Sequence, residues 1–495
     1  MFECALEASH SRAKQIVYIN KLLKYNSGHF NQGRCKVLQS LNPFTGKIIK
    51  TWKENTPEEI EGTLRKADNA FRKWRRISIK KRADLLGELA YQLDSGKHQL
   101  AVEMATEMGK PVTQGHAEIE KCIWVCRYYA QYGARFLSKE VRKTDADKCY
   151  ICHQPLGIIY AVMPWNFPFW QLFRFAAPAV MAGNSFVLKH SPNVTGCAES
   201  IAELFSNAGF PDGLAGVLYI SENDVAKVSE RIIADDRVKA VTLTGSGKAG
   251  SAVAAMAGSS IKKCVLELGG SDPAVILKDA DLKLAASQSA LSRLINTGQN
   301  CISTKRFIVE ENVYSDFLEL LVNEMESRRM GNPMDMKVDL GPMARFDLRD
   351  ILHRQVTDSI DLGAELIAGG SIPEHHGAFY PPTVLTSCRK GMPVFDEETF
   401  GPVAAVCPAR NEEEAVRLAN DTSFGLGASV FTRDIRKGEK ITRKLNAGAC
   451  FVNSYVRSDP RLPFGGIGIS GFGRELYRNG MLEFTNCKTV YVVNG

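Results

Sequence analysis

One of the thirteen cysteines, Cys301, lies in the polar stretch INTGQNCISTKR at residues 295–306. Gly298 and the small polar residues beside it predict a loop, and loops often present reactive side chains. A cysteine thiolate would be a nucleophile for a carbonyl carbon, but an ordinary thiol has a pKa of about 8.5 and is largely protonated at neutral pH. Because loop cysteines are usually inert, this stretch by itself leaves both interpretations open.

Two further polar residues stand in apolar surroundings. Asn166 lies in VMPWNFP (162–168), between Pro164 and Pro168. A core amide with satisfied hydrogen bonds is one interpretation, but the cost of a polar side chain among apolar residues favours a functional role. Glu267 lies in VLELGGSDP (265–273), at the predicted boundary between two lobes. A carboxylate facing a cleft there would act as a general base.

The segment LTGSGKAG (243–250) matches the pattern Gly-x-Gly-x-x-Gly between a predicted strand and a predicted helix. Backbone N–H groups at that helix start would suit a pyrophosphate, although glycine-rich turns also recur for packing reasons. Glu267 follows at about the distance of the acid that binds the ribose in the dinucleotide fingerprint. We do not assign that role to Glu267, because the motif follows a late strand of its lobe instead of the first.

Hydrophobic periodicity predicts the elements that position these residues. Residues 57–140 have apolar residues at three- and four-residue spacing and are predicted to be helical. Short apolar runs then alternate with helical segments from 157 to 258, and a second alternating set runs from 272 to 434. Such alternation is typical of parallel sheets with helices on both faces. We therefore predict an α/β fold with two lobes that meet near Gly269 and Gly270.

Composition limits the class of protein. A chain of 495 residues, 44% hydrophobic and 24% charged, is expected to form two or three globular domains. The net charge of +7 is spread along the sequence without a basic tract, which argues against binding to nucleic acid. The apolar stretch 156–183 contains Pro168, Pro178 and Arg174, so we predict buried core instead of a membrane span.

Cysteine usage and the N-terminus bear on location. Thirteen cysteines without a secretory signal indicate reduced thiols and predict a cytoplasmic protein. Cys149 and Cys152 would point to opposite faces of a strand, so we predict no metal site. Residues 1–36 have no apolar core of signal-peptide length, and we assign no structure to this extension.

Seven motifs occur together in one order: VMPWNFP (162–168), SFVLKHSP (185–192), TGSGKAG (244–250), LELGGSDP (266–273), NTGQNC (296–301), EETFGPV (397–403) and PFGGIGISGFGRE (463–475). This series resembles the aldehyde dehydrogenase superfamily, from Asn42 to about Val493. The resemblance implies two Rossmann-like lobes, one for the cofactor and one catalytic, with a small β element for oligomerisation.

The family resemblance implies a division into domains. We expect an NAD(P)-binding domain from residues 37–143 and 155–269, a catalytic domain from 270–462, and bridging strands at 144–154 and 486–495. The bridging strands are expected to pair between subunits of a homodimer or homotetramer, which would also cover an exposed sheet edge.

The resemblance also implies a mechanism. Cys301 would attack the aldehyde carbonyl, and Asn166 would donate a hydrogen bond to the oxyanion of the thiohemiacetal. After hydride transfer to the nicotinamide, Glu267 would activate water to hydrolyse the thioester to a carboxylic acid. Lys189 is the fourth expected catalytic residue. The implied cofactor-binding residues are Pro164, Trp165, Lys189, Ser191, Gly245, Ser246, Leu268, Glu398 and Phe400, of which Trp165 and Phe400 have core packing as an alternative.

Cofactor preference depends on the segment KHSP (189–192). Many NAD-preferring members of the superfamily have a glutamate three residues after the lysine, which binds both ribose hydroxyls and repels a 2′-phosphate. This chain has Pro192 at that position, and Lys189 and Ser191 are available to contact a phosphate. We therefore expect NADP or NAD as cofactor, with NADP accepted and a preference for it open.

Arg174 lies where succinate-semialdehyde dehydrogenases place an arginine for the substrate carboxylate, and Ser458 resembles their substrate-binding serine. A guanidinium fork suits a carboxylate, but an internal salt bridge of Arg174 is the alternative. Ile295 stands where some relatives have a second arginine, with Arg293 nearby. Ser303 stands where some have a redox-switch cysteine, which excludes a disulfide at that spacing from Cys301.

The predicted activity is the NAD(P)-dependent oxidation of succinate semialdehyde to succinate. Another aldehyde, such as glutarate semialdehyde or an uncharged aliphatic one, is an alternative with the same chemistry. A CoA-acylating enzyme is disfavoured because such members lack the glutamate found here as Glu267. A non-catalytic binding or structural protein is the alternative of a different class, and the joint presence of Cys301, Glu267, Asn166 and Lys189 argues against it.

Overall fold

The computed structural model describes residues 37–374 and 376–494, so the extension at 1–36 lies outside the described residues. β1 (Val37–Leu41) and β2 (Ile48–Lys53) form a two-stranded sheet. Four helices follow, as predicted: α2 (Pro57–Trp74), α3 (Ile79–Ser95), α4 (Lys97–Met108) and α5 (Val112–Phe136). The first begins at a capping box in which Thr56 and Glu59 bond each other's backbone N–H groups, with Pro57 in the first turn.

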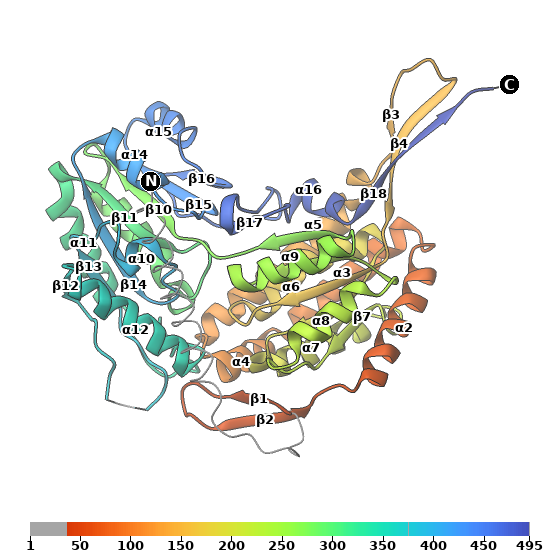
Figure 1. The fold of residues 1–495 in the computed structure, drawn as a ribbon, viewed down its shortest axis with the longest axis horizontal. Helices are drawn as coiled ribbons and strands as arrows, with labels where there is room; N and C mark the ends of the chain where they lie inside the picture. Colours follow the sequence, from red (N-terminus) through yellow and green to blue (C-terminus); the bar gives the residue numbers. More distant parts are fainter. Residues whose placement is uncertain (1–36, 375, 495) are drawn as a thin grey trace, which may run out of the picture. The chain divides into compact units, whose positions relative to one another are not determined.

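A six-stranded sheet has the order β17-β9-β8-β5-β6-β7, and it is parallel except for β17 (Figure 1). Its strands are β5 (Ile158–Met163), β6 (Ser185–His190), β7 (Ala215–Leu218), β8 (Val238–Thr244), β9 (Lys263–Glu267) and β17 (Gly471–Phe472). The connecting helices are α6 (Pro168–Ala182), α7 (Thr195–Asn207), α8 (Val225–Ala234) and α9 (Gly247–Ser259). The alternation predicted for 157–258 is therefore confirmed.

The second sheet has seven strands in the order β12-β13-β14-β11-β10-β15-β16, with only β12 antiparallel. Its strands are β10 (Asp272–Ile276), β11 (Thr304–Glu310), β12 (Glu365–Ala368), β13 (Thr383–Thr386), β14 (Val403–Ala409), β15 (Gly427–Phe431) and β16 (Ala449–Val452). Its helices are α10 (Leu282–Leu294), α11 (Tyr314–Glu326), α12 (Phe346–Asp361), α13 (Pro393–Asp396), α14 (Glu412–Asn420) and α15 (Ile435–Thr442). Short 3-10 turns lie at Pro192–Val194, Ile295–Gly298, Glu311–Val313 and Gly468–Ser470.

A three-stranded antiparallel sheet joins distant parts of the sequence. β18 (Thr485–Val492), which follows α16 (Tyr477–Glu483), pairs along its whole length with β4 (Lys148–Pro155), and β3 (Glu140–Val141) lies on the other side of β4. The two long strands overlap the segments 144–154 and 486–495 in which bridging strands were expected. The hydrophobic pattern did not predict β3, because two residues are too few to show alternation. The helix before β3 ends at Phe136, whereas the predicted helical segment ended at 140.

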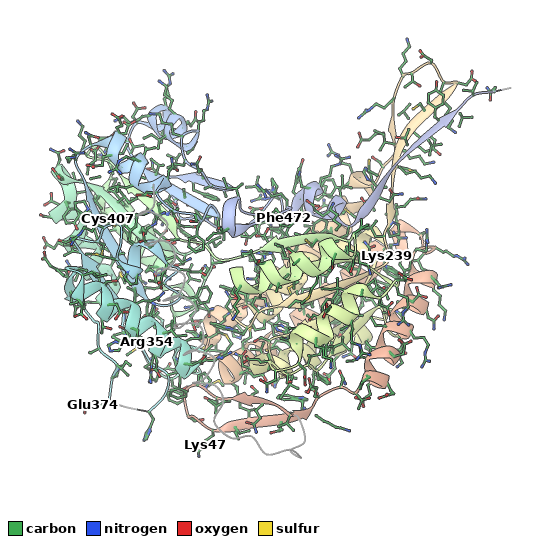
Figure 2. The ribbon with its side chains drawn as sticks, in the orientation of Figure 1. Lys47, Lys239, Arg354, Glu374, Cys407 and Phe472 are labelled. Atoms are coloured by element: carbon green, nitrogen blue, oxygen red, sulfur yellow. The ribbon has the colours of Figure 1, made fainter. Side chains whose placement is uncertain are left out.

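Buried apolar side chains fill the space between sheets and helices, and Cys407 on the buried strand β14 is one of them (Figure 2). The apolar stretch at 156–183 forms β5 and the wholly buried α6, which confirms the prediction of core. Across the described residues, none of the helices has the length and apolarity needed to cross a membrane. The same part of the chain contains no cluster of metal-binding side chains. The fold is the predicted α/β class, with two mainly parallel sheets and a small antiparallel one.

Candidate active site

The carboxyl ends of the parallel strands gather most of the predicted site residues. Asn166 follows β5, Lys189 lies at the end of β6, Gly245 and Ser246 follow β8, and Glu267 ends β9. The chain runs from β5 outward through β6 and β7 and then returns to the other side of β5 with β8. Open α/β sheets bind ligands at such a reversal of strand order, just beyond the carboxyl ends.

Cys301 lies in the loop between α10 and β11 and is half-buried. The residues before it have a constrained backbone, because φ is 56° at Asn296, 55° at Thr297 and 73° at Gly298. Left-handed conformations cost energy for residues other than glycine and persist only when surrounding contacts impose them. Arg293 supplies such contacts by donating to the carbonyl oxygens of Thr304 (3.1 Å) and Gly298. Arg293 is therefore a support of the loop.

The loop also packs against one other motif, EETFGPV (397–403), and is held by Lys305 on β11. A side chain at Gly298 would overlap the backbone of Gly401, since a Cβ there would lie 2.3 Å from its carbonyl carbon and oxygen. Lys305 donates to the carbonyl oxygens of Cys301 (2.6 Å) and Asn300 (3.1 Å), and its Nζ lies 3.6 Å from Glu398 Oε1. Contacts from the distant EETFGPV motif (397–403) and from Lys305 on β11 thus fix the position of the Cys301 backbone.

The thiol of Cys301 is protonated in the resting protein. Burial raises its pKa to about 11, against the opposing influence of Arg174 and Lys305. At neutral pH only about one molecule in ten thousand would then hold a thiolate. Any reaction at Cys301 therefore needs a base or an added positive field to remove this proton.

Asn166 is buried beside the Cys301 loop. Its side-chain amide donates to the carbonyl oxygen of Gln299 over 3.1 Å, which uses one of its two N–H bonds. Its backbone oxygen accepts from Lys110 Nζ (2.9 Å) and Asn296 Nδ2 (2.8 Å). Lys110 is in turn paired with the buried Glu118, so a polar network holds Asn166 at the Cys301 loop.

Glu267 is buried, and neither of its carboxylate oxygens has a hydrogen-bond partner in the described part of the chain. Burial raises its pKa well above the usual range, Arg174 opposes that shift, and Glu475 adds to it. Its Oε1 lies 2.6 Å from where a Cβ of Gly465 would be, so the side chain rests against that glycine. It does not line the cavity that contains Cys301. Burial therefore disfavours the ionised form of Glu267, and its side chain rests against Gly465 outside that cavity.

Arg174 forms an internal ion pair, which was the alternative to carboxylate binding. It is 1% exposed and pairs with Glu475, which is 2% exposed. Its Nη2 lies 3.3 Å from Thr244 Oγ1, and its guanidinium carbon lies 4.6 Å from the centre of the Phe464 ring. The internal salt bridge is thus present, because a neighbouring carboxylate from the last motif balances the charge of the guanidinium.

A cavity of ≈ 300 Å³ opens onto the thiol of Cys301. Arg174 and Ser458 line it as predicted, together with Ile295 and two residues the sequence did not single out, Lys121 and Phe464. Lys121 lies on α5 within a helical pattern of mixed polarity, and its spacing gave no sign that it faces a cavity. Phe464 lies within the glycine-rich motif PFGGIGISGFGRE (463–475), but the motif gave no sign that this side chain faces the cavity.

Three of the predicted cofactor residues offer polar groups that could bind the phosphates or the ribose of a dinucleotide. Lys189 is 7% exposed, its ammonium has no hydrogen-bond or ion-pair partner among the described residues, and burial lowers its pKa to about 8. Ser246 caps α9, and the exposed first turn of that helix offers unpaired backbone N–H groups. Ser191 donates to Asn193 Oδ1 over 2.7 Å.

The remaining cofactor candidates lie where the two sheets approach each other. The ring centres of Trp165 and Phe400 are 5.7 Å apart, edge to face, so these residues from two different motifs pack against each other. Glu398 accepts from the Gly270 N–H over 3.0 Å. Leu268 donates its N–H to Ser470, and Pro164 lies at the end of β5. Free polar groups and a solvent-facing helix start therefore fit a nicotinamide dinucleotide.

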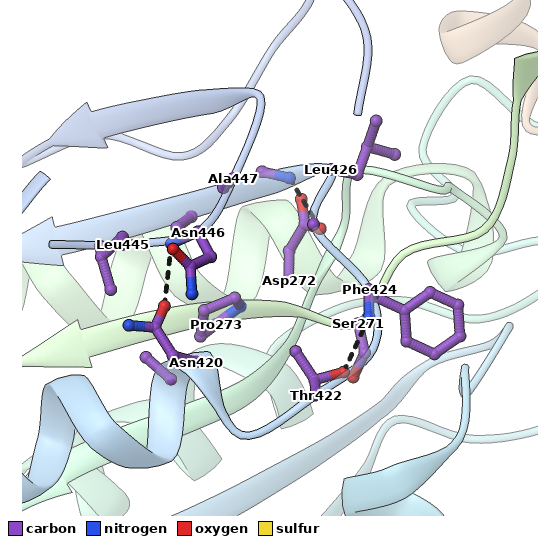
Figure 3. Close-up of a pocket in the computed structure, with 14 residues that line it drawn as sticks. Ser271, Asp272, Pro273, Asn420, Thr422, Phe424, Leu426, Leu445, Asn446 and Ala447 are labelled. Carbon is purple, nitrogen blue, oxygen red and sulfur yellow. Dashed lines mark hydrogen bonds between the residues drawn. The ribbon is translucent and has the colours of Figure 1, made fainter. Parts of the chain in front are cut away.

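A second, smaller cavity lies at the start of β10 and is not suited to a substrate (Figure 3). Asp272 Oδ1 accepts from the Gly427 N–H over 3.0 Å, and Asn420 Oδ1 accepts from the Asn446 N–H over 2.8 Å. The free volume is ≈ 10 Å³, about enough for one water molecule. The first hydrogen bond joins the starts of β10 and β15, and the second joins the end of α14 to the segment after α15.

Comparison with known proteins tests the resemblance suggested by the motifs. The model of the aldehyde dehydrogenase family matches residues 30–490. The chain belongs to the aldehyde dehydrogenase family. Family membership explains why the sheets, the Cys301 loop and the glycine-rich turn occur together, and it confirms the recognition made from the motifs.

Several relatives of this aldehyde dehydrogenase cover almost the whole chain. A probable succinate-semialdehyde dehydrogenase [NADP(+)] of Synechocystis is 45% identical over 92% of this chain and 99% of its own length. A succinate semialdehyde dehydrogenase [NAD(P)+] of Escherichia coli is 45% identical over 91% and 97%. The crystal structure of the Streptococcus pyogenes succinic semialdehyde dehydrogenase with NADP+ is 37% identical, with a TM-score of 0.89 over 92% of this chain and 100% of its own.

Proposed function

We propose that this chain oxidises succinate semialdehyde to succinate with NADP or NAD. The observation that carries this proposal is the charge around the cavity at Cys301. Lys121, Arg174 and Arg457 line it, and its one acidic residue, Glu118, is already paired with Lys110. Such a wall favours an aldehyde that carries a negative charge. The names of the relatives support the same substrate.

Within this proposal Cys301 attacks the aldehyde carbonyl after losing its proton. The free N–H of Asn166 and the backbone N–H of Cys301 stabilise the oxyanion of the thiohemiacetal. The bound nicotinamide cofactor supplies the acceptor for the hydride. Glu267 then takes a proton from water, which requires the buried carboxyl to ionise and to turn from Gly465 toward the thioester.

Lys189 and Ser191 are proposed to hold the adenosine ribose and its phosphate. The unpaired ammonium of Lys189 supports this role, and Pro192 offers no carboxylate to repel a 2′-phosphate. Ser246 and Gly245 would position the pyrophosphate at the start of α9. Trp165, Phe400 and Glu398 would border the nicotinamide, with Leu268 and Pro164 beside them.

Two further proposals concern the setting of the enzyme. We propose a homodimer or homotetramer built through β4 and β18, because the outer edge of β18 has no partner strand within the described residues. The segments 37–143 and 155–269 would serve as the cofactor domain and 270–462 as the catalytic domain. The described cysteines are all free thiols, which supports the proposed cytoplasmic location.

Initial rates with succinate semialdehyde, glutarate semialdehyde and butanal, each with NAD and NADP, test the function. We expect kcat/KM for succinate semialdehyde to exceed that for butanal by roughly 10- to 100-fold, the range of a charge-assisted contact, and NADP to support turnover. Equal values for butanal would contradict the proposed substrate, and a strong NAD preference would contradict the cofactor assignment. Formation of no reduced cofactor with any aldehyde would favour a non-catalytic protein.

A further inference from the structure

The three cations around the Cys301 cavity are not equivalent. Arg174 is buried, paired with Glu475 and stacked on Phe464, so its positive charge is already balanced within the protein. Arg457 is exposed, with its guanidinium carbon 5.9 Å from the centre of the Tyr455 ring. Solvent screens a charge in that position, which makes it a weak anchor for a ligand.

Lys121 is the partly buried cation of this cavity that has no counter-ion among the described residues. Its Nζ donates to Ser458 Oγ over 2.7 Å and lies 4.4 Å from the centre of the Trp170 ring. No carboxylate of the described residues forms an ion pair with it, and Arg174 lies close enough to repel it. Glu118 points elsewhere, accepting from Lys110 and from the N–H groups of Phe169 and Trp170.

A partly buried ammonium without a counter-ion is costly, and the binding of an anionic ligand would offset that cost. The hydrogen bonds of Lys121 and Ser458 show which of their donors remain free to bind a ligand. An ammonium has three donors, of which Ser458 takes one, and because that serine accepts from Lys121 its own O–H remains free to donate. Two ammonium protons and one hydroxyl proton therefore converge on the same corner of the cavity. This set of donors matches the two oxygens of a carboxylate.

We propose that Lys121, assisted by Ser458, binds the carboxylate of the substrate and determines specificity for ω-carboxylated aldehydes, while Arg174 stays in its ion pair with Glu475. This inference rests on the proposed function. In this arrangement the aldehyde end of the substrate faces Cys301 and the carboxylate end lies between α5 and the segment after β16. Arg174 shapes the wall and balances the buried acids.

The test compares substrates that differ only in the carboxylate. Lys121→Met keeps the length of the side chain and its packing on Trp170 but removes the charge. We expect kcat/KM for succinate semialdehyde to fall roughly 10- to 100-fold, mainly through KM, with butanal changed less than about threefold. Inhibition by succinate should weaken in parallel. Lys121→Arg, which retains the charge, should keep most of the discrimination.

Three other variants complete the design. Lys50→Met is the matched control, because Lys50 also lies over a tryptophan, Trp52, but on the surface away from the cavity. Ser458→Ala leaves the packing of Lys121 intact and should cause a selective loss of a few-fold. Arg174→Met leaves Glu475 buried without a partner and should reduce turnover of both aldehydes alike.

The outcomes separate this inference from the function on which it rests. If the wild-type enzyme prefers succinate semialdehyde but Lys121→Met loses both substrates equally, Lys121 is not the anchor and the function stands. A selective loss confined to Arg174→Met would also overturn the inference, in favour of the arginine. If the wild-type enzyme turns over butanal as well as succinate semialdehyde, the proposed substrate fails and Lys121 as carboxylate anchor fails with it.

Discussion

At the scale of single residues, two thiols of this chain have the same acidity in different surroundings. Cys301 and Cys450 are both half-buried, and burial raises the pKa of each to about 11. Neither acidity nor exposure distinguishes Cys301, the proposed nucleophile, from Cys450. What differs is that Cys301 opens onto the cavity, beside the amide network of Asn166, whereas Cys450 lies within β16.

This pair gives a controlled test of the nucleophile. Cys301→Ala should reduce turnover by at least roughly 10⁴-fold, because no other group can form the thioester. Cys450→Ala should change kcat by less than about threefold. The measurements are kcat for both variants and mass spectrometry for an acyl adduct after mixing with aldehyde and cofactor. Turnover that survives in Cys301→Ala would remove this residue from the mechanism.

At the scale of elements, the loop before Cys301 depends on a glycine. Gly298 has a φ of 73°, and a Cβ there would lie 2.3 Å from the backbone of Gly401. Gly298→Ala therefore requires two loops to separate. We expect a loss of about 1–3 kcal/mol in the free energy of unfolding, and a lower kcat because the thiol moves with the loop. Thermal unfolding and kcat measure the two effects.

Gly62→Ala is the control for this substitution. Gly62 lies inside α2, where a Cβ would meet nothing within 4 Å. Alanine there should stabilise the protein by about 0.5–1 kcal/mol and leave kcat unchanged. Equal stability changes at the two glycines would mean that the close approach to Gly401 does not hold the loop.

The elements also show what a sequence can predict here. The periodicity of α2 to α5, the alternation of strands and helices, and the ordered motifs were sufficient for the fold and for the loop of Cys301. The partners of Arg174 and Lys121 were not predictable, because Glu475 and Ser458 are hundreds of residues away and only the packed sheets bring them near. The orientation of Glu267 toward Gly465 likewise depends on tertiary packing and cannot be predicted from the residues next to it in sequence.

At the scale of the whole molecule, activity on the two classes of aldehyde should respond differently to pH. Burial and Arg174 on α6 lower the pKa of Lys121 to about 8, while Cys122 and Glu118 on α5 and Asp459 after β16 oppose that shift. The side chain of Lys121 is therefore positively charged below about pH 8 and loses that charge as the pH rises through this value. The pKa values of Cys301 and Glu267 are raised, so their deprotonated, reactive forms also become more populated as the pH rises.

The ratio of kcat/KM for succinate semialdehyde to that for butanal separates these effects. Ionisation of Cys301 and Glu267 serves both substrates and cancels in the ratio, whereas only the carboxylate needs the charge of Lys121. The ratio should be constant from pH 6 to 7 and fall above about pH 8, by up to about tenfold per pH unit. In Lys121→Met it should be low and independent of pH. A wild-type ratio that stays constant up to pH 10 would mean that the charge recognising the carboxylate does not titrate, and would point back to an arginine.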